Sequence, residues 1–242
     1  MSLKSKNVLF CGEITETSGS IIKVLLNENV KCLVIGNTIE DSIDQLGLAD
    51  ERVSHYAADL TKIEDLEMIY TKTLARTKKK VHLVINHKEL NADDLWEDVI
   101  TTHINSLICS TLMAIKHLGS MNAGNGGTVV NSIVIRGRSD DEYASIHRLL
   151  NDLDRSFSDP YYFNNTAVRI LTMCTRMEIG QGSDGGANVS AEAHHAHPAG
   201  AHVSGSGELE KIGVQLLDVC ANKHSLLDQP HMVEEFEISV RN

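Results

Sequence analysis

Short apolar runs alternate with segments of helical periodicity along most of this chain of 242 residues. Continuous apolar strands separated by amphipathic helices are typical of a parallel sheet that helices cover on both faces. We therefore expect the α/β class: a single doubly wound domain over residues 1–242, with a mostly parallel sheet of about seven strands. The runs that predict strands are Val8–Cys11, Lys31–Ile35, Val53–Ala57, Val81–Ile85, Thr128–Ile135, Ala167–Cys174 and Val233–Val240.

Two long segments carry the clearest helical periodicity, and one segment breaks the pattern. Residues 96–118 and 143–157 place apolar side chains on one helical face, and a later helix is expected over 209–219. The segment 180–207 is rich in Gly, Ala, Ser and His and is too long for an ordinary connection. We expect it to be a mobile loop or a lid over a functional site.

Charge and composition argue against several classes of protein. The formal net charge is −11, whereas nucleic-acid binding needs clustered basic surface; the one basic run, Lys78–Lys80, is expected to solvate a helix end. No apolar run approaches the roughly 20 residues that a membrane-spanning helix needs. The start of the chain has no signal-peptide core, so we expect a cytoplasmic protein. The five cysteines lack CxxC spacing and are expected to be free thiols, most of them buried.

The first predicted strand leads into a turn that is unusual for its position. It runs into Gly12-Glu13-Ile14-Thr15-Glu16-Thr17-Ser18-Gly19 and then into a helix. In a dinucleotide-binding α/β domain, a glycine-rich turn at this point holds the cofactor diphosphate on backbone amides and the helix dipole. Here carboxylates stand in much of the turn. We therefore expect a Rossmann-like framework whose phosphate site is altered.

Several short motifs follow one another along the chain: Asp59-Leu60-Thr61, Leu83-Val84-Ile85-Asn86, Asn105, Gly126-Gly127-Thr128-Val129-Val130-Asn131 and Tyr143. Together with the order of the predicted elements, they resemble the short-chain dehydrogenase/reductase family over nearly the whole chain. The chain length and the C-terminal strand look like the insect-type alcohol dehydrogenase branch. The resemblance implies NAD or NADP as cofactor and oxidoreductase chemistry, and it suggests a degenerate member.

The family's cofactor residues carry over onto only a few positions. Gly12 matches the first glycine of the turn, and Asn37 stands where an acidic residue would hold the ribose hydroxyls. Asp59 matches the residue that contacts adenine, although a helix cap is at least as plausible. Asn86 begins the motif that the family writes Asn-Asn-Ala-Gly, and the chain continues His87-Lys88-Glu89 with bulky charged side chains. Cofactor binding is therefore doubtful.

Glu13 and Glu16 allow two interpretations. A carboxylate about 5 Å from a phosphate charge costs about 3 kcal/mol at an effective dielectric constant of about 20. Without a ligand, the same carboxylates would be favourable at the N-terminus of the helix. Either these two glutamates replace the phosphate as the resident anion, or both point to solvent.

The catalytic set is also altered. The family uses a Tyr and a Lys four residues apart, and here the pair reads Tyr143 and His147. Asn105 matches the helix asparagine that supports a proton relay, which is more simply structural here. The family serine falls near Val134, which offers no donor. Arg176 stands in place of the family's Pro-Gly, where it would fill the cofactor cleft, pair with a glutamate there or lie on the surface.

A histidine cluster lies in the segment 180–207. Imidazoles suit Zn, Cu and Ni, and four clustered rings are enough to hold a metal ion. The alternatives are a low-complexity loop with incidental metal affinity and a pH-sensitive segment, because clustered histidines charge together near pH 6. The cluster consists of His194, His195, His197 and His202.

Three functions remain open from the sequence. The first is a non-catalytic relative of the reductases that acts in binding, storage or assembly, without a cofactor. The second is an NAD- or NADP-dependent oxidoreductase that uses Tyr143 with His147 in place of lysine. The third is metal binding through the histidine cluster. In each case we expect a homodimer or homotetramer through 96–118 and 143–157, no nucleic acid, no membrane and an unknown small-molecule ligand.

Overall fold

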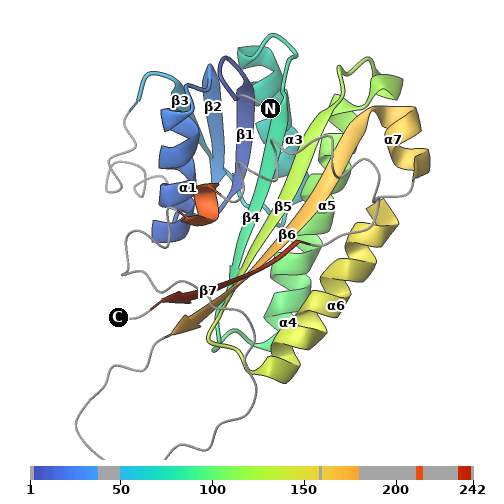
Figure 1. Ribbon diagram of the computed structural model, residues 1–242. Helices are drawn as coiled ribbons and strands as arrows, with labels where there is room; N and C mark the ends of the chain where they lie inside the picture. Colours follow the sequence, from blue (N-terminus) through green and yellow to red (C-terminus); the bar gives the residue numbers. More distant parts are fainter. Residues whose placement is uncertain (1–2, 38–49, 158–159, 180–210, 215–233, 241–242) are drawn as a thin grey trace, which may run out of the picture.

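The computed structural model describes residues 3–37, 50–157, 160–179, 211–214 and 234–240. Its centre is a seven-stranded sheet in the order β3-β2-β1-β4-β5-β6-β7, and every neighbouring pair is parallel. The predicted α/β class and the strand number are confirmed (Figure 1). The strands are β1 (Asn7–Gly12), β2 (Cys32–Asn37), β3 (Val53–Ala57), β4 (Leu83–Leu90), β5 (Gly127–Arg136), β6 (Val168–Ile179) and β7 (Glu234–Val240).

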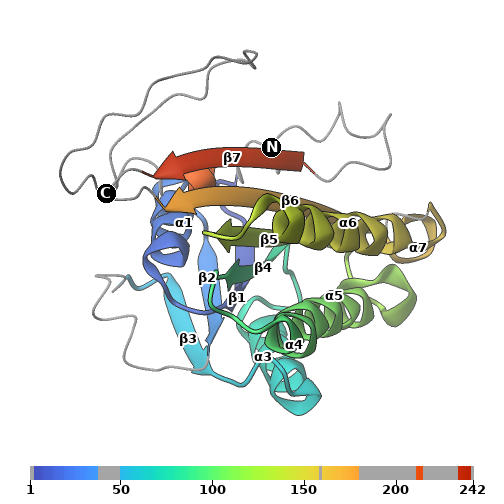
Figure 2. The ribbon, with the colours of Figure 1, turned by 90° about the horizontal axis from the view of Figure 1, so that it is seen from below.

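Helices cover both faces of this sheet (Figure 2). Ile21, Ile22 and Leu25 of α1 pack in one core with alternate side chains of the central strands. Side chains of α3, α5 and α6 pack in two further cores with the remaining strand side chains, so these helices cover the opposite face. The helices are α1 (Glu16–Asn27), α3 (Ile63–Arg76), α4 (Trp96–Asp98), the π-helical turn η1 (Val99–Ile104), α5 (Asn105–Leu118), the 3-10 turn η2 (Ser120–Asn122), α6 (Asp140–Phe157) and α7 (Pro160–Thr166).

The long helix expected over 96–118 is interrupted. A π-helical turn, η1, separates α4 from α5, and it includes the β-branched run Val99–Thr102, whose residues are weak helix formers. Contrary to the expectation from the sequence, one helix among the described residues, Trp96–Leu118, is long and apolar enough to cross a membrane, but half of its most apolar window is buried inside the fold. The burial is that of a core helix, since α5 contacts β4, β5 and β6.

The second long helix begins earlier than its apolar pattern indicated. Helix α6 starts at Asp140, and three acidic residues occupy its first turn, where the helix dipole favours negative charge. Helix α7 was not expected, and Pro160 stands at its first position, where the missing N–H has no intrahelical partner to lose. Of the later helix expected over 209–219, only residues 211–214 are described, and they are helical.

Candidate functional site

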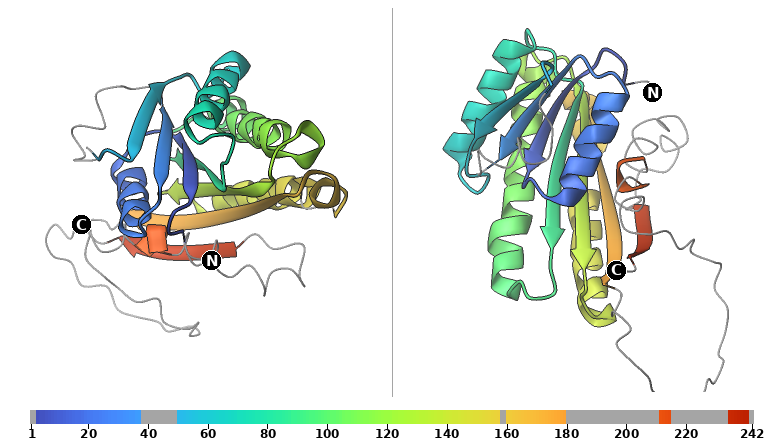
Figure 3. Two further views of the ribbon diagram at one scale, coloured as in Figure 1. Left: turned by 90° about the horizontal axis from the view of Figure 1, so that it is seen from above. Right: turned by 90° about the vertical axis from the view of Figure 1, so that its left-hand side faces the viewer.

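The carboxyl ends of the parallel strands meet at one edge of the sheet, and helix α1 begins there (Figure 3). The chain builds β1, β2 and β3 outward in one direction and then returns to add β4 on the other side of β1. This reversal of strand order is the topological switch point, beside which open α/β folds bind their ligands. The first candidate site is therefore the edge formed by β1, β4 and the start of α1.

Side chains already accept hydrogen bonds from some of the backbone N–H groups at the start of α1. Thr15 is the N-cap residue, and its side chain accepts a hydrogen bond from the backbone N–H of Ser18. The Ser18 hydroxyl in turn accepts from the backbone N–H of Thr15 at 2.7 Å, which completes a capping box. These backbone donors are among those that an incoming anion would otherwise use.

A buried carboxylate lies against this helix start, and it belongs to Glu89 of β4. Glu89 accepts a hydrogen bond from the Thr15 hydroxyl and a second, 2.8 Å long, from Nε of Arg136. Arg136 is the last residue of β5, and its Nη2 donates to the hydroxyl of Thr17 in α1. Because β4 lies between β5 and β1, the arginine reaches across β4 to the helix. We call Glu89 and Arg136 the edge ion pair.

Burial and charge together set the protonation of the edge ion pair. The side chain of Glu89 is only 8% exposed. Burial alone would raise its pKa, but the hydrogen bond and charge of His87, the hydrogen bond from Thr15 and the charge of Arg136 outweigh it. The pKa of Glu89 is lowered to about 2, so the resident group is a carboxylate anion at neutral pH.

His87 extends the edge ion pair inward between the strands. Its Nε2 lies 3.3 Å from Oε1 of Glu89, and its Nδ1 lies 3.3 Å from the hydroxyl of Ser132 on β5. His87 and Ser132 are register partners in β4 and β5, and both are almost fully buried. A Ser–His–Glu row of this kind resembles a nucleophile triad, but a hydroxyl with no exposed surface is a structural hydrogen-bond partner.

The two glutamates of the turn do not take the predicted place. Glu13 and Glu16 are both exposed, so the interpretation as resident anions is wrong and the solvent alternative holds. The buried anion comes instead from Glu89, which stands at the glycine position of the family's Asn-Asn-Ala-Gly motif. That substitution was visible in the sequence, but the contact of Glu89 with α1 depends on the pairing of β4 with β1.

The lowered pKa of Glu89 predicts a dependence of stability on acid pH. Its pKa changes from an ordinary 4.5 to about 2 on folding. The stabilisation is therefore complete above pH 4.5 and is lost as the pH falls toward 2, and its full size is about 3 kcal/mol. Urea unfolding of the wild-type chain and of Glu89→Gln across this range measures the difference. Equal pH dependence of the two proteins would contradict the assignment.

Gly12, the first glycine of the turn, lies against the backbone of β4. Gly12 and His87 are register partners, and a Cβ at position 12 would lie 2.7 Å from the His87 carbonyl oxygen. Only a residue without a side chain fits this approach. The close packing of β1 against β4 therefore requires glycine at position 12, independently of any ligand.

Gly12→Ala is expected to lower the free energy of unfolding by about 2 kcal/mol, because a backbone oxygen cannot move aside as a flexible side chain can. Gly127→Ala is the matched control, since the nearest atom to its Cβ is Leu118 Cδ1 at 3.3 Å. The control should lose less than half as much. Equal losses in chemical unfolding would mean that the contact with His87 does not limit position 12.

Asn86 is held in a buried amide network between the sheet and α5. Its Nδ2 donates to Oδ1 of Asn131 at 2.9 Å, and its Oδ1 accepts from the Ser110 hydroxyl at 2.6 Å. Thr111 joins the same network, also through Asn131. Asn86 is 1% exposed, so the network fastens α5 to β4 and β5 and leaves little of this residue for a cofactor.

Asp59 has the role of a cap in this structure. Its carboxylate accepts from the backbone N–H and the hydroxyl of Thr61, and it pairs with Lys62 at 3.2 Å. These hydrogen bonds, with the charge of Lys62, lower the pKa of Asp59 to about 2. Lys62 itself is the N-cap of α3, so Asp59 closes the turn that precedes the helix. Asn37 ends β2, and its side chain lies outside the described residues.

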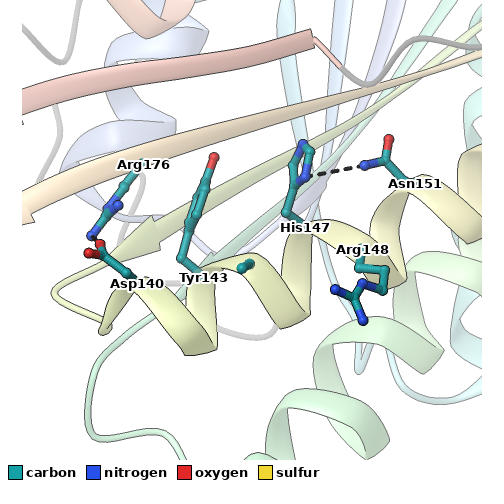
Figure 4. A pocket seen from close by; sticks show the side chains of 7 residues that line it. Asp140, Tyr143, His147, Arg148, Asn151 and Arg176 are labelled. Atoms are coloured by element: carbon teal, nitrogen blue, oxygen red, sulfur yellow. Dashed lines mark hydrogen bonds and ion pairs between the residues drawn. The ribbon is translucent and has the colours of Figure 1, made fainter. Parts of the chain in front are cut away.

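A second candidate site is a cavity of about 510 Å³ along α6 (Figure 4). Tyr143, His147 and Asn151 follow one another at intervals of four residues and project to the same side of the helix. The rings of Tyr143 and His147 are stacked with centroids 6.0 Å apart, and Nδ1 of His147 lies 3.2 Å from Nδ2 of Asn151. The lining residues are Asp140, Tyr143, Ala144, His147, Arg148, Asn151 and Arg176.

Arg176 reaches this cavity from β6. Its guanidinium lies over the ring of Tyr143, 5.0 Å from the centroid, and it forms an ion pair with Asp140. Asp140, the first residue of α6, is therefore one partner of Arg176. Sequence reasoning also missed Asn151, although the spacing of four residues that links Tyr143 to His147 recurs from His147 to Asn151.

The other family-matched positions do not join the α6 cavity. Asn105 begins α5 with an exposed side chain, and its structural interpretation stays a prediction. Val134 lies in the apolar core, where it offers no donor. No group of three or more metal-ligating side chains occurs in the part of the chain that the structure describes. The histidine cluster lies outside that part, as does the loop 180–207.

Of the cysteines in the described ranges, all are free thiols, as expected. Burial raises the pKa of Cys11 to about 12 despite a hydrogen bond with Ser110 and the charge of Lys88, so this thiol is unreactive at neutral pH. Cys32 and Cys174 are buried, and Cys109 is partly buried.

The parallel sheet, the switch point at β1 and β4 and the helix that follows β1 define a dinucleotide-binding type of α/β fold. No protein-family model matches the chain. Alcohol dehydrogenase 1 of Ceratitis capitata is 24% identical over 182 residues, which cover 72% of this chain and 70% of that protein. Fat body protein 2 of Drosophila melanogaster is 22% identical over 177 residues, which cover 70% and 69%.

Solved structures show the same architecture at low sequence identity. A short-chain dehydrogenase/reductase family oxidoreductase from Aeromonas hydrophila has a TM-score of 0.60 and 14% identity, over 98% of this chain and 99% of that chain. One from Burkholderia phymatum in complex with NAD has a TM-score of 0.56 and 14% identity, over 73% and 67%. The chain is thus similar in sequence to these alcohol dehydrogenases, and it shares the fold of short-chain dehydrogenase/reductase oxidoreductases.

Proposed function

We propose that this chain is a non-catalytic member of the family that acts in binding, storage or assembly, and that its own edge ion pair occupies the place of a cofactor diphosphate. The observation that carries the proposal is the Glu89 carboxylate, which is bonded to the N-cap Thr15 and to Arg136. In dinucleotide-binding folds, the diphosphate lies on this helix start. Here an anion of the protein takes that position.

Electrostatics opposes a diphosphate beside the Glu89 carboxylate. A phosphate charge about 5 Å from Glu89 would meet a repulsion of about 3 kcal/mol at an effective dielectric constant of about 20. The alternative is to withdraw Glu89, and that would separate a largely buried carboxylate from Arg136 and Thr15. Neither route is favourable. We therefore propose that the chain works without NAD or NADP, even though relatives of this fold were solved with NAD.

The cavity along α6 supports a binding role. Its volume of about 510 Å³ falls within the range of small-molecule sites, and charged, aromatic and amide groups line it. We further propose a cytoplasmic homodimer or homotetramer through 96–118 and 143–157. Leu112 supports such an interface, because it is an exposed apolar residue on α5. The exposed face of α6, in contrast, is mostly polar.

A second candidate function is an NAD- or NADP-dependent oxidoreductase. The stacking of Tyr143 and His147 in the α6 cavity favours it, because the two residues at the positions of the family pair lie together. In that case the hydroxyl of Tyr143 would donate the proton to a carbonyl substrate. Metal binding through His194, His195, His197 and His202 stays a third prediction, and elemental analysis of untagged protein for Zn, Cu and Ni tests it.

Calorimetric titration of the full chain with NADH and NADPH separates the first two functions. We expect no saturable heat, and no oxidation of either nucleotide with a panel of aldehydes and ketones. Tyr143→Phe serves as the matched control, because it removes one hydroxyl and leaves the ring under Arg176 in place. Saturable binding with turnover that Tyr143→Phe abolishes would replace the proposal with the oxidoreductase function.

A further inference from the structure

Lys88 of β4 is a buried amine without a partner among the residues that the structure describes. It is 7% exposed, and it forms no hydrogen bond or ion pair within the described ranges of the chain. Buried lysines are rare unless they are paired. Other buried charges in this fold follow that rule, since Glu89 is paired with Arg136 and Arg138 with Glu142. An unpaired ammonium at this depth therefore calls for a chemical explanation.

The position of Lys88 is the carboxyl edge of β1 and β4, at the switch point. Gly12 and His87 are register partners, so Lys88 follows the last residue of β4 that pairs with β1, and the charge of Glu13 acts on it. Lys88 shares a face of β4 with Asn86, which bonds to α5, and so it lies on the side opposite the edge ion pair. Nζ of Lys88 is not fully enclosed by the protein, so the end of the side chain reaches solvent.

The groups around Lys88 favour a neutral ligand. The carboxylates of Glu13 and Asp59 act electrostatically on Lys88. Carboxylates at Glu13 and Asp59 would repel an anionic ligand that approached the amine. Burial nevertheless lowers the pKa of Lys88, despite the opposing charge of Glu13, so a larger share of this amine is neutral near pH 7 than in an exposed lysine. A neutral amine is nucleophilic.

His103 supplies a group for proton transfer on the same side. It lies in the π-helical turn η1, which contacts β4, and π-helical turns are frequent at functional sites. Burial lowers the pKa of His103, and the positive charge of Lys88 lowers it further, so the imidazole is neutral at pH 7. Its buried Nδ1 has no hydrogen-bond partner among the described residues. A neutral imidazole accepts a proton at one nitrogen and donates at the other.

We propose that Lys88 binds a small aldehyde covalently as an imine, with His103 moving the protons. The neutral Nζ attacks the carbonyl carbon, and a proton passes from nitrogen to the carbonyl oxygen to give a carbinolamine. Protonation of the hydroxyl then lets it leave as water while the C=N bond forms, and the resulting iminium nitrogen gives back that proton to leave the imine. Amine and aldehyde become imine and water, so no oxidant or reductant is needed. The site goes beyond the binding role proposed above and does not depend on the α6 cavity.

Reductive trapping tests the proposal on the full chain. The protein is incubated with propanal and cyanoborohydride at about pH 6.5, and peptide mass spectrometry follows each lysine with time. Lys62, whose side chain is 65% exposed, is the internal control. We expect initial labelling at Lys88 to be severalfold faster than at Lys62, because its lowered pKa leaves a larger share of the amine neutral. Equal or slower labelling of Lys88 would overturn the proposal.

Two variants and one ligand separate the possible outcomes. Lys88→Met should abolish the fast label and leave labelling at Lys62 unchanged, with circular dichroism as the check on folding. His103→Gln should slow labelling at Lys88 alone, and an unchanged rate would remove His103 from the mechanism. The proposed function fails separately, because NADH binding would appear in calorimetry whether or not Lys88 labels quickly.

Discussion

Glu89→Gln is expected to lower the free energy of unfolding at neutral pH by about 2–3 kcal/mol, one of the largest effects of any polar substitution in this chain. Glutamine keeps the shape of the side chain but leaves Arg136 without a counter-charge and weakens the acceptor of Thr15. Removing one partner of a largely buried ion pair costs more than the pair contributes, because the remaining charge stays desolvated. Urea unfolding monitored by circular dichroism measures the change.

A double-mutant cycle shows whether the loss belongs to the edge ion pair. Arg136→Met alone should cost a similar amount, and Glu89→Gln with Arg136→Met should cost less than the sum by at least about 1 kcal/mol. Lys116→Gln is the control, because Lys116 and Glu67 form a solvent-exposed pair 2.8 Å apart that should contribute about 0.5 kcal/mol or less. Additive losses at Glu89 and Arg136 would mean that the two side chains act independently.

Glu89→Ala is expected to create an anion site where the wild-type chain has none. Without the carboxylate, Arg136 and the start of α1 present positive charge to the same point. Calorimetric titration with inorganic diphosphate should change from no saturable heat to a dissociation constant in the millimolar range or below, a gain of at least about tenfold in affinity. The cause is the loss of a competing anion that belongs to the protein itself.

The control for this gain is Glu89→Ala combined with Arg136→Met, which removes the cation as well as its counter-charge. Diphosphate binding should then disappear, and circular dichroism confirms that both variants are folded. If the wild-type chain binds diphosphate as tightly as Glu89→Ala does, then Glu89 does not hold the site and the proposed function loses its support.

The sheet was predictable because its signals are local. Each strand is a continuous apolar run and each main helix carries its own periodicity, so neither needs knowledge of the rest of the chain. The same local signals gave the strand ends to within a few residues, apart from β4 and β6, which continue past their apolar runs into polar residues such as Lys88 and Arg176. Those extensions are where the site residues lie.

The site was less predictable because its contacts join distant residues. Glu89 and Arg136 are 47 positions apart, and Arg136 and Thr17 are 119 apart, so only the strand order brings them together. Glu13 and Glu16 were predicted as resident anions because they lie in the turn in sequence, but both side chains are exposed. Proximity along the chain does not say which way a side chain points in a turn.

Other features of the site depend on details of the backbone that the apolar periodicity of a helix does not predict. The π-helical turn that presents His103 interrupts a helix whose apolar pattern is continuous through it. The ion pair between Arg176 and Asp140 depends on where α6 begins, one turn before the first apolar residue of its pattern. The spacing of Tyr143 and His147, in contrast, was enough to place both residues on one helix face, and they are stacked there.

A crystal structure of the full chain soaked with a high concentration of NADH is the most direct measurement. The electron density at the first turn of α1 shows whether the Glu89 carboxylate or the diphosphate of the nucleotide occupies this position. We predict Glu89 in contact with Thr15 and Arg136, and no nucleotide at the helix start. A diphosphate on that turn, with Glu89 displaced and the nicotinamide beside Tyr143, would contradict the account.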